Sequence, residues 1–146
     1  MDYSSAFAIS AAGMKVEQMR VDVTSLNLAN VHTTRAPDGT LYQPLKVVSQ
    51  PKVSFSQMLQ AQQGKIANID SGPQVKLEQS TAAPKLVQDP GHPQADENGF
   101  VEYPNVNPVD EMVNLVSAQR AYEANVRAFN AAKTMALRAL QIGGNK

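Results

Sequence analysis

Apolar residues near the N-terminus recur at the spacing of an α-helix. One row rises by alternating steps of three and four residues, the a/d pattern of a heptad seam: Ile9, Ala12, Val16, Met19, Val23 and Leu26. A second row recurs every seven residues on the opposite side: Phe7, Met14, Val21 and Leu28. The pattern predicts a helix over residues 4–29. Because a surface helix needs only one apolar stripe, two stripes predict that this helix is covered from both sides.

A second helical pattern covers residues 108–141. Asn107 suits the N-cap, Pro108 suits the first helical position, and the pair Gly143-Gly144 ends the pattern. The heptad seam consists of Met112, Leu115, Tyr122, Val126, Phe129, Ala136 and Leu140. Beside this seam runs a row of mostly small side chains, which would let another helix approach closely: Ala118, Ala121, Asn125, Ala128, Ala132 and Ala139.

Between the two helices the sequence changes character. Eight of the nine prolines lie within residues 30–107. Four short segments with strand character are separated by turns rich in Pro, Gly, Asp and Asn; they are residues 45–48, 52–55, 74–79 and 99–103. The Gln-rich segment 55–65 fits either a short helix or an irregular chain.

These patterns predict an α+β fold in which long N- and C-terminal helices form a coiled-coil pair around a small inserted β-rich domain. The three parts are an N-terminal helix at 1–30, a loop and β-rich domain at 31–107, and a C-terminal helix at 108–146. If the helices pair, part of the apolar surface stays uncovered, and exposed apolar stripes indicate an interaction surface. The alternative is a helical hairpin packed fully on its own β-domain, and the pattern leaves both possibilities open.

Composition and charge narrow the class of protein. Lys+Arg and Asp+Glu number 13 each, so the basic excess typical of a nucleic-acid binder is absent from the sequence. The chain has no cysteine, which excludes disulfides, thiolate metal ligands and a cysteine nucleophile. Its N-terminus has Asp2 where a signal peptide is basic, and no apolar run reaches about 18 residues. The sequence therefore predicts either a cytoplasmic protein or export without a cleaved signal peptide.

The residues suited to catalysis are few. His92 stands in "DPGHPQADENG" beside several carboxylates, and His32 lies in the loop after the first helix. A metal site or a small enzyme built on the His92 turn is one interpretation. A turn rich in residues that make turns is the simpler interpretation. Phosphate-binding glycine loops and the GxSxG nucleophile motif are absent from the sequence, so we expect no catalytic residues, cofactor, metal or small-molecule substrate.

The segment "MKVEQMRVDVTSLNLANVHTT" resembles the N-terminal signature of flagellar rod and hook proteins, an apolar helix that ends in Ser-x-Asn-Leu-Ala-Asn. Two more segments resemble the proximal-rod members of that family: "TTRAPDGTLYQPLKVV" and "DPGHPQADENGFVEYPNVNPVDEMVNLVSAQRAYEANVRAFNAAKTM". The resemblance covers about the first 48 and the last 58 residues, and the Gln-rich part from 55 to 72 does not share it.

The resemblance implies a structural subunit of the proximal rod of the bacterial flagellar basal body, which polymerises through its terminal helices into a helical tube that transmits torque. The implied partners are further copies of itself, proximal and distal rod subunits, the adaptor at the export gate and MS ring, and the flagellar type III export apparatus. The implied location is the periplasm-spanning rod, reached without a cleaved signal peptide. The alternatives are another axial protein of the same family and a cytoplasmic coiled-coil adaptor.

Two sets of residues are then expected at subunit interfaces. The first set, on the N-terminal helix and the loop after it, is Ile9, Val16, Met19, Val23, Leu26, Asn27, Leu28 and Asn30. The second set, on the C-terminal helix, is Met112, Leu115, Tyr122, Val126, Phe129 and Leu140. We further expect the loop from His32 to Gln43 to reach adjacent subunits, and both helices to be largely disordered until they dock.

Asn27 and Asn30 close the first helix, although Asn is a weak helix former. On the family interpretation they fix where the helix ends, and their amides bond the backbone or a neighbouring subunit. Simple capping and turn formation would explain them equally well. If the family interpretation holds, Asn30→Ala weakens assembly more than it destabilises the monomer.

Overall fold

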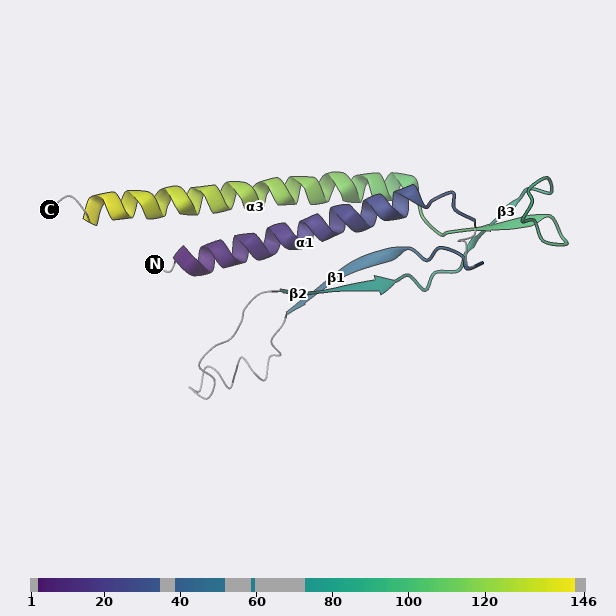
Figure 1. The fold of residues 1–146 in the computed structure, drawn as a ribbon, viewed down its shortest axis with the longest axis horizontal. Coiled ribbons are helices and arrows are strands. Elements are labelled where there is room, and N and C mark those ends of the chain that lie inside the picture. The colour runs from purple at the N-terminus through teal and green to yellow at the C-terminus, as the bar shows by residue number, and fades with distance from the viewer. Residues whose placement is uncertain (1–2, 35–38, 52–58, 60–72, 144–146) are drawn as a thin grey trace. The chain divides into compact units, whose positions relative to one another are not determined.

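The computed structural model describes residues 3–34, 39–51, 59 and 73–143. In chain order its elements are α1 (Tyr3–Ala29), β1 (Leu45–Pro51), β2 (Pro73–Gln79), β3 (Lys85–Gln88), β4 (Phe100–Tyr103) and α3 (Pro108–Gly143) (Figure 1). The α+β class is confirmed: two long terminal helices pack together and small antiparallel sheets lie between them in the sequence.

Both predicted helices and three predicted strands are confirmed. β1, β2 and β4 coincide with the strands expected at 45–48, 74–79 and 99–103. β3, which has only four residues, was not predicted from the sequence. The expected strand at 52–55 and the Gln-rich segment 55–65 lie outside the described residues, apart from Leu59.

Close contacts within the chain form two compact units. The first unit comprises Met1–Gln18, Val48–Lys76 and Gln119–Lys146, and the second comprises Met19–Val47 and Leu77–Ala118. Each long helix contributes one part to each unit.

In the first unit α1 and α3 lie side by side and run antiparallel (Figure 1). The rings of Phe7 and Phe129 stack with their centroids 4.9 Å apart and their planes at 49°. Such an aromatic pair adds about 0.5–1.5 kcal/mol beyond its buried area. Further along, Gly13 meets Asn125, and the position of a β-carbon on Gly13 would lie only 2.8 Å from the Asn125 Oδ1 atom. Glycine therefore lets the two helices approach closely at this point.

The second unit contains the β3–β4 hairpin and the start of α3. β3 and β4 pair antiparallel, with Val87 opposite Val101, and Val101 is 1% exposed. β1 and β2 form a separate two-stranded sheet. The Ser80 N–H, just after β2, donates to the Pro44 carbonyl, just before β1, at 2.7 Å, as antiparallel pairing requires.

The start of α3 has the predicted cap. The Asn107 Oδ1 atom accepts the Val109 N–H at 3.1 Å, and the Asn107 carbonyl accepts the Glu111 N–H at 3.0 Å. The Asn107 amide also donates to Asp110 at 2.8 Å. Asn107 thus satisfies an N–H group that has no partner inside the helix.

The turn around His92 joins β3 to β4 by local hydrogen bonds. The His92 Nδ1 atom accepts the Gln94 N–H at 3.2 Å, and the Asp96 carboxylate accepts the N–H groups of Asn98 and Phe100 at 2.9 and 2.7 Å. Gly99 has φ of +79°, a conformation that side chains disfavour. These polar side chains therefore serve the backbone of the turn.

Candidate functional site

The face on which α1 and α3 meet is made largely of small and polar side chains. Gly13 meets Asn125 in the first unit, and Asn27 meets Glu111 in the second. Both residues of the second contact are fourteen positions from their counterparts in the first, which is two heptads on each helix. Ala118 and Ala132 continue the same seven-residue row of α3 and are 0% and 5% exposed. The helix pair therefore uses the small-residue row of α3 as its contact face.

The expected interface residues fall into three groups by exposure. Ile9, Leu26, Met112, Tyr122 and Leu140 are exposed; Ile9 and Leu140 reach 67% and 72%. Val16, Met19, Leu28, Asn30, Leu115, Val126 and Phe129 are half-buried. Val23 and Asn27 are buried within the chain. Five of the expected interface residues therefore expose much of their side chain on the surface of this chain.

Further apolar residues of α3 are also exposed, and the sequence reading missed them. They are Val109, Val113, Val116, Met135, Leu137 and Ile142. With Met112, the first three follow the spacing i, i+3, i+4, i+7 of a helix face. The same spacing is visible in the sequence and could have identified the first three.

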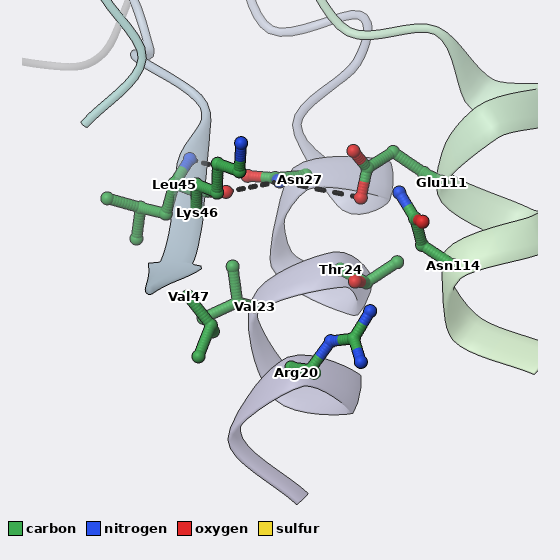
Figure 2. Close-up of a pocket in the computed structure, with 9 residues that line it drawn as sticks. All are labelled: Arg20, Val23, Thr24, Asn27, Leu45, Lys46, Val47, Glu111 and Asn114. Atoms are coloured by element: carbon green, nitrogen blue, oxygen red, sulfur yellow. Dashed lines mark hydrogen bonds between the residues drawn. The ribbon is translucent and has the colours of Figure 1, made fainter. Parts of the chain in front are cut away.

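Asn27 links the end of α1 to the loop before β1 and to Leu45, the first residue of β1. Figure 2 shows its bonds to Leu45. Its Oδ1 atom accepts the Leu45 N–H at 2.9 Å and the Tyr42 hydroxyl at 2.8 Å. Its amide nitrogen donates to the Leu45 carbonyl at 2.9 Å and more weakly to Glu111 Oε2 at 3.5 Å. The amide of Asn27, which is 3% exposed, therefore uses its full hydrogen-bonding capacity inside the chain.

Asn30 acts more locally than Asn27. Its amide nitrogen donates to the Leu26 carbonyl at 2.9 Å, one turn earlier, and its Oδ1 atom accepts the Thr33 hydroxyl at 3.2 Å. Its backbone N–H also bonds the last turn of the helix. Asn30 thus supplies partners to the end of α1, as capping predicts.

A small polar cleft in the second unit surrounds Asn27. Its lining residues come from the end of α1, the start of β1 and the start of α3: Arg20, Val23, Thr24, Asn27, Leu45, Lys46, Val47, Glu111 and Asn114 (Figure 2). Burial, and secondarily the charge of Glu111, raises the pKa of the Tyr42 hydroxyl above its ordinary value of 10.0. Tyr42 thus remains a neutral hydrogen-bond donor to Asn27 at physiological pH.

The described residues give little support for a metal site or a membrane-spanning helix. Among them, no three His, Cys, Asp or Glu side chains gather closely enough to hold a metal ion. No helix in the described ranges is both long and apolar enough to cross a membrane. The exposed apolar side chains of the terminal helices form the candidate functional site.

Known proteins resemble the chain over nearly its whole length. A family model described as the C-terminal region of the flagellar basal body rod FlgEFG proteins matches residues 97–142. The chain is 43% identical to the flagellar basal-body rod protein FlgC of Bacillus subtilis (strain 168), over 92% of this chain and 94% of that relative. It is 36% identical to FlgC of Borreliella burgdorferi, over 97% and 98% of the two chains. With FlgC of Salmonella typhimurium it shares 37% identity, over 94% and 95%.

Proposed function

Because the chain belongs to the FlgC family of flagellar basal-body rod proteins, we propose that it joins the rod through its two terminal helices. Membership makes it a structural subunit of the flagellar basal body that assembles with other rod proteins. What membership leaves open is which surface forms the subunit contacts.

One observation carries the proposal: apart from the Phe7–Phe129 pair, the helices bury small residues between them and leave many large apolar ones exposed. Ala118 and Ala132 are buried, whereas Ile9, Leu140 and Ile142 are 67%, 72% and 83% exposed. Fully burying one such large side chain contributes about 1.5–3 kcal/mol. Several of them together would supply enough free energy to order the contact and hold neighbouring subunits in the rod.

The finer parts of the proposal concern place and route. The loop after α1 and the segment from residue 89 onward resemble proximal-rod members, which supports a position in the proximal, periplasm-spanning rod. We propose export through the flagellar type III apparatus without a cleaved signal peptide. The proposed neighbours are proximal and distal rod subunits, further copies of the chain, and the adaptor at the export gate and MS ring. Long helices packed on several neighbours would resist twist, because the load spreads over many small contacts.

The other interpretations gain no support from the family. The named relatives are rod proteins, which favours neither a cytoplasmic coiled-coil adaptor nor an enzyme built on His92. The His92 Nδ1 atom is also engaged with the Gln94 N–H. A structural subunit explains the exposed surface, which an adaptor or an enzyme would need only in part.

The test is to purify detergent-resistant basal bodies from flagellated cells and to probe the rod, hook and filament fractions for the chain. We expect the chain in the rod fraction only. The double variant Ile9→Ser/Leu26→Ser, which removes exposed apolar side chains from α1, should be absent from that fraction. Arg127→Ser is the matched control, since this exposed residue makes only a surface ion pair with Glu123.

Two results would overturn the proposal. The wild-type chain could remain in the cytoplasm of flagellated cells and never enter the rod fraction. Alternatively, the double variant could enter rods as well as the control variant does, in which case the exposed apolar residues of α1 would not form subunit contacts.

A further inference from the structure

The last turns of α3 extend beyond the end of α1. Since Phe7 pairs with Phe129 and the helices are antiparallel, the first residue of α1 corresponds to about residue 133 of α3. α3 continues to Gly143, which leaves roughly ten residues, or about 15 Å, without α1 alongside (Figure 1). We call residues 134–143 the overhang.

The overhang is rich in exposed apolar side chains. Leu137 and Leu140 are three residues apart and lie on one face, which Lys133 also shares at a spacing of four from Leu137. Both leucines are more than half exposed. Met135 and Ile142 are seven residues apart on another face, and both are exposed too. The overhang therefore offers two apolar faces that this chain leaves uncovered.

The first turns of α3 carry the second exposed group. Val109, Met112, Val113 and Val116 share one helix face and are 43–66% exposed. We call these four residues the start cluster. Asp110 stands beside it, and the charged side chains of this first turn are acidic. In contrast, the charged residues from 133 to 143 are Lys133 and Arg138, both basic.

We infer that the Leu137–Leu140 face of the overhang docks on the start cluster of a second copy of this chain. Opposite charge favours that occupant, because Lys133 would face Asp110 across the contact.

This contact is heterologous, because two different surfaces meet: in a pair, one copy keeps its start cluster unused and the other keeps its overhang unused. A symmetric dimer would instead place the start cluster of one copy against the start cluster of another and bring like charges together. Head-to-tail contact therefore suits a subunit of an extended rod. The inference rests on the proposed function, to which it adds the partner and the residues of one contact.

Disulfide trapping in assembled rods tests the contact, because the chain has no cysteine of its own. Two differently tagged copies, one with Val113→Cys and one with Leu140→Cys, are expressed together in flagellated cells that lack the native gene. Basal bodies are isolated and oxidised, and products are separated without reductant. We expect a dimer that contains both tags, and no dimer when either variant is expressed alone.

The charge argument is tested on the same background. Lys133→Gln in the Leu140→Cys copy should lower the yield of mixed dimer roughly two- to five-fold, the scale of an exposed ion pair. Lys85→Gln, the same loss of charge on β3 and so outside both helix surfaces, should leave the yield unchanged. An unchanged yield with Lys133→Gln would overturn the Lys133–Asp110 pairing, which is the reason for inferring that a second copy docks here.

Failure of this inference is distinguishable from failure of the proposed function. Rods that contain both tagged copies but give no mixed dimer would overturn the contact and leave the structural role intact. Dimers from one variant alone would show a symmetric contact instead, and a product joined to a different rod protein would refute the second copy as occupant. Absence of both tagged copies, together with absence of the wild-type chain from rods, would contradict the proposed function itself.

Discussion

At the scale of single residues, the two asparagines that end α1 differ in reach. Asn27 bonds Tyr42 and Leu45, fifteen and eighteen residues away, whereas Asn30 bonds groups within four residues of itself. The sequence could predict that both amides need partners. It could not predict that Asn27 would find them in the loop before β1 and at Leu45, where β1 begins, since this segment returns to the helix only in the folded chain.

Replacing the two asparagines should therefore have unequal effects on the monomer. Asn27→Ala leaves the Leu45 N–H and the Tyr42 hydroxyl without their partner, and we expect a loss of about 2–3 kcal/mol in the free energy of unfolding. Asn30→Ala should cost about 0.5–1 kcal/mol, since water can reach the groups it releases. Urea unfolding followed by circular dichroism, with an osmolyte to favour the folded state, measures both. Equal losses of unfolding free energy in the two variants would contradict the view that Asn27 bonds distant residues and Asn30 only local ones.

Asn30 also carries the expectation drawn from the family signature. Asn30→Ala should lower incorporation into rods by a larger factor than the monomer's loss of stability accounts for. Quantifying the variant in basal bodies against its unfolding free energy tests this. A loss of incorporation equal to the loss of stability would mean that Asn30 is only a cap.

Tyr42 predicts a change of stability at alkaline pH. Its folded-state pKa is raised, so the unfolded chain ionises first as the pH passes 10.0. Stability is therefore fully present below that pH and is lost as the pH rises through the folded-state pKa. Tyr42→Phe should cost about 1 kcal/mol at neutral pH, because it removes the hydrogen bond to Asn27.

The test is how the difference in unfolding free energy between wild type and Tyr42→Phe changes with pH. Unfolding of wild type and Tyr42→Phe is measured from about pH 8 to about pH 11. The stability gap between the two should narrow as the pH rises. A gap that stays constant or widens would mean that Tyr42 does not ionise at a shifted pH.

At the scale of elements, periodicity identified the helices but not the face on which they pair. The apolar seam of α1 and its Gly13–Asn27 face recur with the same heptad period, so spacing alone cannot distinguish them. Side-chain size distinguishes the two faces. Small residues such as Gly13 and Ala118 let the backbones of the two helices come closer together than Ile9 and Met112 would. β3 was missed for a different reason: "KLVQ" is too short to show alternation and owes its strand form to pairing with β4.

The Gly13–Asn125 contact predicts a coupling between two helices. Gly13→Ala alone should destabilise the chain by about 1 kcal/mol, because the new methyl group displaces an Asn125 side chain that is bonded to the Ala121 carbonyl. In the Asn125→Ala background the same change should stabilise by up to about 1 kcal/mol, through helix propensity. A double-mutant cycle on urea unfolding measures this coupling. Additive effects of the two substitutions would show that the helices do not touch there.

At the scale of the whole molecule, the apolar core is small for the length of helix it supports. Among the described residues, the buried hydrophobic side chains are Val23, Val101, Ala118 and Ala132, two of which are alanines. Ordering two long helices costs conformational entropy, which opposes folding by about 1–2 kcal/mol per residue for the backbone. We therefore expect much of the free energy that orders the helices to come from contacts with neighbouring subunits.

This imbalance predicts how the helices behave before and after assembly. In the free monomer, amides of α1 and α3 should exchange with solvent far faster than global unfolding of a stable domain allows, and fastest in the overhang. In isolated rods the same amides should be strongly protected, because neighbouring subunits cover the exposed apolar residues. Hydrogen exchange with mass spectrometry on both samples measures the difference, and the β3–β4 hairpin is the internal reference because it should change less. Full protection of both helices in the monomer would mean that the chain folds completely on its own and docks as a preformed unit.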